Sequence, residues 1–263
     1  MRTAKKKRLG TILAITLLAL GVFTYTNNQR VDRSDEMYDP IIVDFPLRGE
    51  WYAPNTPGTK IPSHGTNKLG TRYAYDFIQV DWNRKGYPAY RVSLAQYLLF
   101  GIPLNEYYCW GQEIYAPCDG VVIQAEDGYT ERTRTNLFSD LFNAYKNARY
   151  FDPVKDDVRS VAGNYIIIEC GESIYAALVH LQTNSIGVSV GQSVKKGDFI
   201  GRVGHSGNSF APHLHFQLMD SCDISTANGL PCAFAEYEIF QDGEWKRVTN
   251  GIPTDEDRIR FLK

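Results

Sequence analysis

Residues 164–181 read Asn-Tyr-Ile-Ile-Ile-Glu-Cys-Gly-Glu-Ser-Ile-Tyr-Ala-Ala-Leu-Val-His-Leu. Two β-prone runs, 164–169 and 173–181, flank the three-residue turn 170–172, which is a typical signal for a β-hairpin. Between residues 188 and 201 the chain continues as short apolar runs interrupted by glycines, and residues 214–218 alternate between apolar and polar side chains. No βαβ rhythm is present, so we expect a mainly β protein.

The composition is that of a folded, weakly charged protein. The chain has 263 residues, a formal net charge of −2, 43% hydrophobic residues and 22% charged residues. Disordered chains are poorer in apolar residues and carry a larger net charge, so wholesale disorder is excluded. A protein with no net positive charge is also a poor candidate for binding nucleic acid.

The first 25 residues differ from the rest. A basic cluster precedes an uncharged, largely apolar stretch at 9–25, which is the layout of an export signal or a membrane anchor. No small-residue cleavage pattern follows the apolar run, so we favour an uncleaved anchor. We therefore expect a cytoplasmic tail (1–8), a signal-anchor or signal peptide (9–25) and an extracytoplasmic tether (26–46). The protein is then a single-pass membrane protein, or a secreted or cell-envelope protein if the segment is cleaved.

The exported part divides into a main domain at 47–220 and a small β extension at 221–263 that packs on it. Two stretches interrupt the β pattern of the main domain and are read as insertions, at 82–108 and 130–161. The second has helical spacing of its apolar residues, so we expect a helix there.

An exported chain permits disulfides, and the five cysteines leave at least one free. Proximity along the chain favours the pairs Cys222–Cys232 and Cys109–Cys118, although sequence alone cannot fix connectivity.

The placement of the histidines is the most informative chemical feature. His213 and His215 alternate along a strand-like run, so both side chains face the same side of a sheet. His180 ends the apolar strand 175–181, and Asp76 is an acid within another apolar strand. Buried polar groups need a partner, and a set of histidines and an aspartate with an open position is what a catalytic zinc requires. Hydrogen-bonded surface histidines, and a salt bridge between Asp76 and Arg72, are the alternatives.

Several segments together resemble the lysostaphin-like (LytM-type) zinc endopeptidases. These segments occur in the family's order, between about residues 62 and 220: Arg72-Tyr-Ala-Tyr-Asp76-Phe, Ile114-Tyr-Ala-Pro-Cys-Asp-Gly120-Val-Val, Gly163-Asn-Tyr-Ile-Ile-Ile, Val179-His180-Leu181, Val190-Gly-Gln-Ser-Val-Lys-Lys-Gly197-Asp-Phe-Ile-Gly201 and Ser206-Gly-Asn-Ser-Phe-Ala-Pro-His213-Leu-His215-Phe. The resemblance implies a compact antiparallel β-sheet or β-sandwich-like endopeptidase domain that binds one Zn²⁺. It also implies a hydrolase of peptide bonds in bacterial cell-wall peptidoglycan.

Carried over by motif, the resemblance makes His215 and Asp76 zinc ligands and gives His180 and His213 catalytic roles. The family usually has a histidine four residues before the aspartate, where this chain has Arg72. We expect His64 to be the third ligand, which requires the loop 65–70 to fold back toward the metal.

Two further positions depart from the family pattern or fall outside it. Leu178 stands where the family often has a tyrosine that helps stabilise the oxyanion. His205 matches no catalytic position, and we expect it to be an exposed turn residue.

Two other functions stay open. The same fold can serve as an inactive wall-binding or amidase-activating module, although members of that kind typically lack the metal ligands. A zinc hydrolase acting on another exported polymer or on a soluble peptide would differ only in its substrate.

Overall fold

The computed structural model describes residues 39–261, apart from residue 154. The predicted cytoplasmic tail, apolar segment and most of the tether therefore lie outside the described residues. Within this described range, no helix has both the length and the apolar character needed to cross a bilayer.

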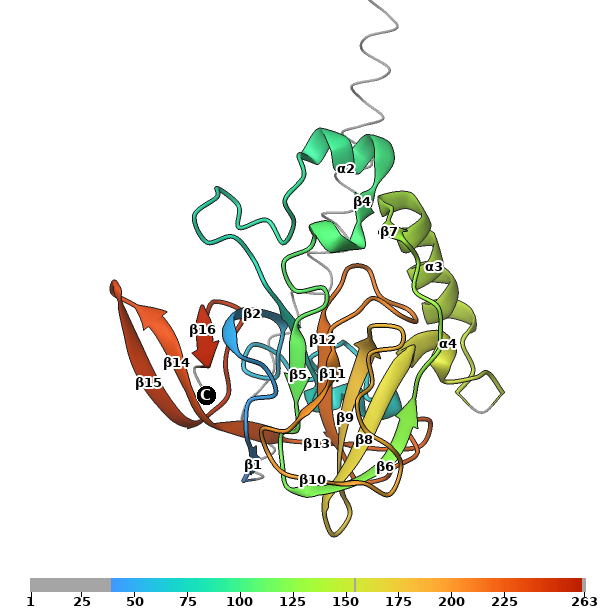
Figure 1. The fold of residues 1–263 in the computed structure, drawn as a ribbon, viewed down its shortest axis with the longest axis vertical. Helices are drawn as coiled ribbons and strands as arrows, with labels where there is room; N and C mark the ends of the chain where they lie inside the picture. Colours follow the sequence, from blue (N-terminus) through green and yellow to red (C-terminus); the bar gives the residue numbers. More distant parts are fainter. Residues whose placement is uncertain (1–38, 154, 262–263) are drawn as a thin grey trace, which may run out of the picture. The chain divides into compact units, whose positions relative to one another are not determined.

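The described domain is mainly β, as the sequence predicts (Figure 1). Its large sheet has the strand order β1-β14-β16-β2-β3-β12-β9-β8-β6-β10, with β13 beside β12 and β15 beside β14. All of the pairings are antiparallel except that of β1 with β14, which is parallel. The predicted hairpin of residues 164–181 is present as β8 and β9. Two short pairs, β5 with β11 and β4 with β7, complete the β structure of this part of the chain.

The bounds of the sheet strands are β1 (Ile41–Val43), β2 (Gly49–Asn55), β3 (Tyr75–Ile78), β6 (Gly120–Glu126), β8 (Asn164–Gly171), β9 (Ile174–Leu181), β10 (Ser193–Val194), β12 (Leu214–Met219), β13 (Gly229–Leu230), β14 (Cys232–Gln241), β15 (Glu244–Gly251) and β16 (Ile259–Phe261). The remaining elements are η1 (Lys68–Tyr73), α2 (Leu94–Phe100), β4 (Ile102–Pro103), η2 (Leu104–Glu106), β5 (Glu113–Tyr115), β7 (Arg134–Thr135), α3 (Leu137–Tyr150), α4 (Arg159–Ala162) and β11 (Phe199–Arg202).

The core is aromatic and aliphatic, and it draws on the first and last described strands. Phe45 packs edge-on against Phe77 and Phe234, with ring centroids 4.9 Å apart in both pairs. Tyr75 lies stacked on Phe77, and Trp51 is 1% exposed. Because aromatic side chains bury large apolar areas, this cluster is a principal source of the domain's stability.

Two predicted boundaries need correction. Val43 and Phe45 belong to the core, and β1 pairs with β14, so the fold begins before residue 47. The segment 221–263 is not a small extension packed on the main domain, because β14 and β16 are strands of the large sheet and Phe234 is fully buried. Sequence reasoning missed this because a three-residue strand at 41–43 shows no periodicity and its partner lies near the other end of the chain. The predicted Asp242-Gly243 turn does join β14 to β15.

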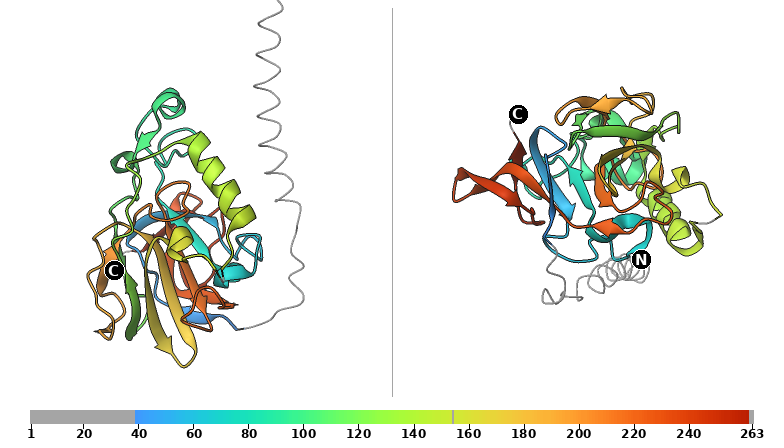
Figure 2. Two further views of the ribbon diagram at one scale, coloured as in Figure 1. Left: turned by 90° about the vertical axis from the view of Figure 1, so that its right-hand side faces the viewer. Right: turned by 90° about the horizontal axis from the view of Figure 1, so that it is seen from below.

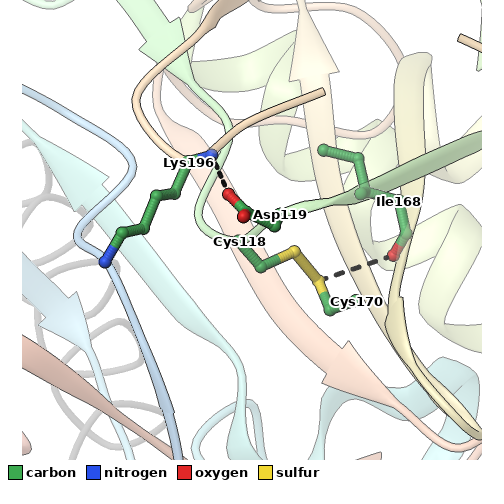
Figure 3. The surroundings of a disulfide bond; sticks show 5 residues. All are labelled: Cys118, Asp119, Ile168, Cys170 and Lys196. Carbon is green, nitrogen blue, oxygen red and sulfur yellow. Dashed lines mark hydrogen bonds between the residues drawn. A yellow bond between two sulfur atoms is a disulfide. The ribbon is translucent and has the colours of Figure 1, made fainter. Parts of the chain in front are cut away.

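The preferred cysteine pairs are wrong. The structure joins Cys118 to Cys170, whose Cα atoms are 5.7 Å apart (Figure 3). Cys118 lies just before β6 and Cys170 near the end of β8, and the antiparallel register of these strands places Val121 opposite Glu169. Spatial neighbours in a sheet can be far apart in sequence, which is why proximity along the chain selected the wrong partners. The other three cysteines are free.

Both interruptions of the β pattern contain helices. The segment 130–161 holds α3 and the start of α4, and 82–108 holds α2. The two are joined by the pairing of β4 with β7, in which Ile102 lies opposite Thr135. Figures 1 and 2 show α2 and α3 at the same end of the domain, opposite to the end where β1 begins.

Candidate metal and catalytic site

The sheet register brings three polar side chains together on adjacent strands. Asp76 of β3 pairs with His215 of β12 on one side and with Asn55 of β2 on the other. Asp76 Oδ1 lies 2.9 Å from His215 Nδ1, and Asn55 Nδ2 donates to Asp76 Oδ2 at 2.7 Å. Both Asp76 and His215 are less than 10% exposed. The carboxylate therefore lies in a largely desolvated position, where it needs a positive partner.

His64 reaches the same carboxylate from outside the sheet. The chain folds back between residues 65 and 73, with Leu69 and Gly70 in left-handed conformations at φ 58° and 71°. Ser63 N donates to the carbonyl of Arg72 at 3.0 Å and closes this loop. As a result, His64 Nε2 lies 3.0 Å from Asp76 Oδ2. The loop thus takes the fold-back that the sequence analysis required of it.

Arg72 does not neutralise the acid. Its side chain donates to the Tyr73 hydroxyl and to Asn67 Oδ1, and three imidazoles face Asp76 instead. Burial raises the pKa of the Asp76 carboxyl, but the nearby imidazoles of His64 and His213 outweigh this effect and hold it well below its ordinary value.

His180 and His213 lie beside this cluster. Their ring centroids are 4.7 Å apart, and His213 Nε2 is 3.4 Å from Asp76 Oδ1. His180 has a left-handed backbone, with φ of 63°, which is costly for a residue with a side chain and recurs at functional sites. Burial lowers the pKa of His180 well below its ordinary value, which keeps this imidazole neutral.

Backbone carbonyls fix the tautomer of both rings. His180 Nδ1 lies 2.9 Å from the carbonyl oxygen of Ser206, and His213 Nδ1 lies 2.8 Å from that of Ala211. A carbonyl can only accept, so each Nδ1 carries a proton, and in the neutral ring each Nε2 presents a lone pair. Both rings are therefore able to accept a proton at Nε2.

The two candidate metal-binding histidines are oriented in the same way. His215 Nε2 lies 2.9 Å from Gln217 Oε1, and the amide of Gln217 is itself fixed because its Nε2 donates to the carbonyl of Leu69. His64 Nδ1 lies 3.0 Å from the Ser63 hydroxyl, which donates to the carbonyl of Thr71 and so accepts from the ring. In its neutral form, each ring therefore turns its unprotonated nitrogen toward Asp76.

This arrangement fits a divalent cation. An imidazole lone pair and a carboxylate oxygen 3 Å apart repel each other unless a proton or a cation lies between them, and here two such pairs converge on Asp76. Donor atoms of His64, Asp76 and His215 lie within 4.8 Å of one another, and so do those of His180, His213 and His215. Nitrogen and carboxylate donors in a set of three, with a further position open, are typical of zinc sites in hydrolases.

His205 is not the exposed turn residue that the sequence predicts. It is 1% exposed, and its Nε2 accepts from Arg132 Nη2 at 2.9 Å. Glu131 accepts from the backbone N–H of His205 and from Trp110 Nε1. The insertion that follows residue 130 covers this loop, and such coverage by a remote segment leaves no local sequence signal.

Sequence reasoning missed the side chains that orient the site. Gln217 could have been found, because it follows His213 and His215 at the same two-residue spacing and so shares their face of β12. Asn55 could not, because its contact with Asp76 depends on the pairing of β2 with β3. Ser63 could not, because its bond to Thr71 depends on the fold-back of the following loop.

Comparisons with known proteins agree with the motifs. The model of peptidase family M23 matches residues 107–227. Peptidoglycan DD-endopeptidase ShyA of Vibrio cholerae serotype O1 is 40% identical over 58 residues, which are 22% of this chain and 13% of that protein. The chain thus matches only a small part of this relative's length.

Two solved structures are similar to this chain at low TM-scores. A zinc-containing peptidase from Vibrio cholerae has 21% identity and a TM-score of 0.29, over 68% of this chain and 35% of that one. The catalytic domain of the antimicrobial peptidase lysostaphin from Staphylococcus simulans has 20% identity and a TM-score of 0.32, over 69% of this chain and 88% of that one.

The family match begins at residue 107, so His64 and Asp76 lie before it, whereas His180, His213 and His215 lie within it. The chain carries a peptidase family M23 domain, which confirms the family predicted from its motifs.

Proposed function

We propose that this protein is a zinc-dependent endopeptidase that hydrolyses peptide bonds in bacterial peptidoglycan. The observation that carries the proposal is the convergence of His64, Asp76 and His215 on one point, with two further imidazoles beside it. The family match supports a peptidase, and the motif resemblance and the ShyA similarity support peptidoglycan as the substrate.

His64, Asp76 and His215 would hold the zinc ion, in tautomers that Ser63 and Gln217 set. When bound, zinc supplies Lewis acidity and lowers the pKa of a coordinated water toward 7.

His180 and His213 would act as the general base and the general acid of the hydrolysis. One Nε2 accepts the proton of the attacking water, and the other ring, protonated, donates to the oxyanion that forms as the amide carbonyl is attacked. The proton then passes to the leaving amine, so the peptide bond breaks with water added across it. The two rings differ, because burial lowers the pKa of His180, whereas at His213 the Asp76 carboxylate outweighs burial and raises the pKa.

The test compares His180→Ala and His213→Ala with the parent protein on purified peptidoglycan, with products identified by mass spectrometry. We expect each substitution to lower the rate about 10²–10⁴-fold while the bound zinc and the folded fraction stay at parent values. Asp76→Asn is the matched variant that should lose zinc as well. If His213→Ala with zinc bound cleaved peptidoglycan at the parent rate, the catalytic assignment would be wrong.

The same experiment separates the enzyme from an inactive module. A parent protein that holds zinc and binds peptidoglycan, yet releases no peptide products, would exclude an endopeptidase and favour the wall-binding or activating role. Digestion of defined fragments would also identify the bond that is cleaved.

We further propose that residues 9–25 anchor the chain in the cell membrane with the catalytic domain outside. The basic cluster before this apolar stretch supports that orientation. Membrane fractionation and protease accessibility of the domain in whole cells test it, and recovery of the domain in the cytoplasm would contradict it.

A further inference from the structure

The short helix α2 exposes nearly all of its apolar side chains. None of its seven residues is buried, and Leu94, Leu98, Leu99 and Phe100 are 49–72% exposed. Single exposed apolar residues are common on protein surfaces, but contiguous apolar patches mark interaction sites. The helix thus contributes little of its apolar surface to the domain's own core.

A second helix at the same end of the domain exposes two further aromatic side chains. Phe138 and Phe142 of α3 are 70% and 66% exposed. The two insertions are fastened together, since β4 pairs with β7 and Arg134 Nη1 donates to the carbonyl of Phe100 at 2.7 Å. Both helices lie at one end of the domain (Figures 1 and 2). We call this surface the apolar tip; it consists of Leu94, Leu98, Leu99, Phe100, Phe138 and Phe142.

The surroundings of the apolar tip contain more basic than acidic residues. From residue 81 to residue 106 the chain contains Arg84, Lys85 and Arg91 against Asp81 and Glu106. Arg84, Arg91 and Arg134 donate to backbone carbonyls, and none of the three forms an ion pair with a carboxylate of the described residues. Their guanidinium groups are therefore not engaged in ion pairs within the described part of the chain.

Asp140, the acidic residue of α3, does not offset the positive charge around the apolar tip. Asp140 is 3% exposed and forms an ion pair with Arg132, so it faces the interior of the domain and not the tip. Lys146, on the same helix, is exposed.

We propose that the apolar tip docks on a lipid bilayer surface that carries anionic headgroups. Exposed leucine and phenylalanine side chains flanked by arginine and lysine are the combination that binds such surfaces, because the apolar groups enter the acyl boundary and the cations stay among the headgroups. A bilayer accepts apolar side chains that point in several directions, as those of α2 do, whereas a folded partner would need a complementary groove.

The length of chain before the domain is compatible with this contact. The stretch between Tyr25, the end of the predicted membrane segment, and Asp39 can extend about 45–50 Å. A domain of about 220 residues has a radius of gyration of about 17 Å. An anchored chain is therefore long enough for the tip to reach the same bilayer, even though β1 begins at the other end of the domain (Figure 1).

Docking would also position the candidate site. Ala211, two residues before His213, packs against the buried cluster that Val92, Ile102 and Tyr107 of the first insertion form. Arg132 of the second insertion donates to the carbonyl of Ser209. The loop that carries His213 is thus held by both insertions, and a tip on the bilayer would keep this loop close to the membrane surface.

The experiment measures hydrogen–deuterium exchange of the full chain in vesicles of phosphatidylethanolamine and phosphatidylglycerol. We expect the amides of residues 95–101 to exchange at least about tenfold more slowly than in vesicles of phosphatidylcholine alone, because docking shields the helix from water. Leu99→Ser combined with Phe100→Ser should abolish this protection. Val190→Ser, which replaces an apolar residue that is also 65% exposed but lies away from the tip, should leave it unchanged.

Three outcomes would overturn the proposal. Equal exchange of residues 95–101 in the two kinds of vesicle would exclude a role for anionic headgroups. Protection that needs no lipid and increases with protein concentration would assign the tip to a second copy of the chain. Protection that purified peptidoglycan produces, with no effect of lipid, would assign it to the substrate. The outcome is separable from the proposed function, because cleavage of soluble peptidoglycan fragments does not depend on the tip.

Discussion

At the scale of single residues, hydrogen-bond partners decide which nitrogen each imidazole presents to the site. Gln217 is an example, because it makes no contact with Asp76 yet holds the proton of His215 on the far nitrogen. We expect Gln217→Met to weaken zinc binding about 10–100-fold, whereas Gln217→Glu, which keeps an acceptor at this position, should retain more of the affinity. Competition with a chelating dye measures both, and equal affinity of the Met variant and the parent would contradict the orienting role.

His205 makes folding stability depend on pH. Burial, together with the charge of Arg132, lowers the pKa of His205 to about 3, whereas in the unfolded chain it titrates near its ordinary value of 6.5. Below pH 6.5 the unfolded state therefore binds more protons than the folded state, and stability is lost as the pH falls toward 3. Between pH 7 and pH 5 this one residue accounts for a loss of about 2 kcal/mol.

Urea unfolding of the zinc-free protein at pH 7 and pH 5 measures that loss. His205→Asn should show a smaller decrease between the two pH values than the parent, whatever its stability at pH 7. His180, whose pKa is also lowered by burial, is present in both proteins and contributes equally. An identical decrease in parent and variant would show that His205 is protonated in the folded state.

Motif order and strand alternation are local signals, so the sequence alone could name His180, His213, His215 and Asp76 as candidates, and their roles stay predictions. His213 and His215 had to share a face of one strand, and Asp76 stood out as an acid in an apolar run. The contact of Asn55 with Asp76 and the burial of His205 depend on which distant segments meet, and no periodicity reports that.

At the scale of elements, the disulfide between Cys118 and Cys170 joins the ends of β6 and β8 across 52 residues of sequence. Closing a loop of that length lowers the conformational entropy of the unfolded chain. In the chain-entropy model this stabilises the folded state by about 4 kcal/mol. We expect Cys118→Ala combined with Cys170→Ala to lose stability of this order, seen as a lower urea midpoint. Cys222→Ala, a change at a free cysteine, is the control, and an equal loss in both would contradict the pairing.

Arg132 connects the second insertion to the loop that carries His213, a candidate catalytic residue. It pairs with Asp140 of α3 and donates to the carbonyl of Ser209, whose hydroxyl lies 3.1 Å from His213 Nδ1. We expect Arg132→Met to lower kcat by at least about tenfold, because small displacements of a catalytic ring are costly, while zinc content stays unchanged. Arg132→Lys should recover part of the rate. A change in KM alone would assign Arg132 to substrate binding instead.

The elements themselves were only partly predictable. The β8–β9 hairpin and the β14–β15 turn carry strong local signals, whereas β1, with three residues, carries none. The sheet edge that β1 and β14 form is a long-range pairing, so the domain boundary placed at residue 47 was wrong.

At the scale of the whole molecule, the candidate metal ligands come from segments that are far apart in the sequence. His64 comes from the loop before η1, Asp76 from β3 and His215 from β12. Zinc that binds only the folded state at a free concentration of a thousand times its Kd should stabilise the domain by about 4 kcal/mol. Thermal unfolding with zinc and with a chelator measures this, and Asp76→Asn should abolish the difference. An unchanged Tm in the parent would argue against a metal at these three residues.

The parallel pairing of β1 with β14 has a consequence for biosynthesis. The earliest described strand pairs with β14, which follows β2–β13 in the chain, so this edge of the sheet cannot form until β14 has been synthesised. A translation product that ends before residue 232 would thus contain all five candidate site residues and still lack the parallel edge of the sheet.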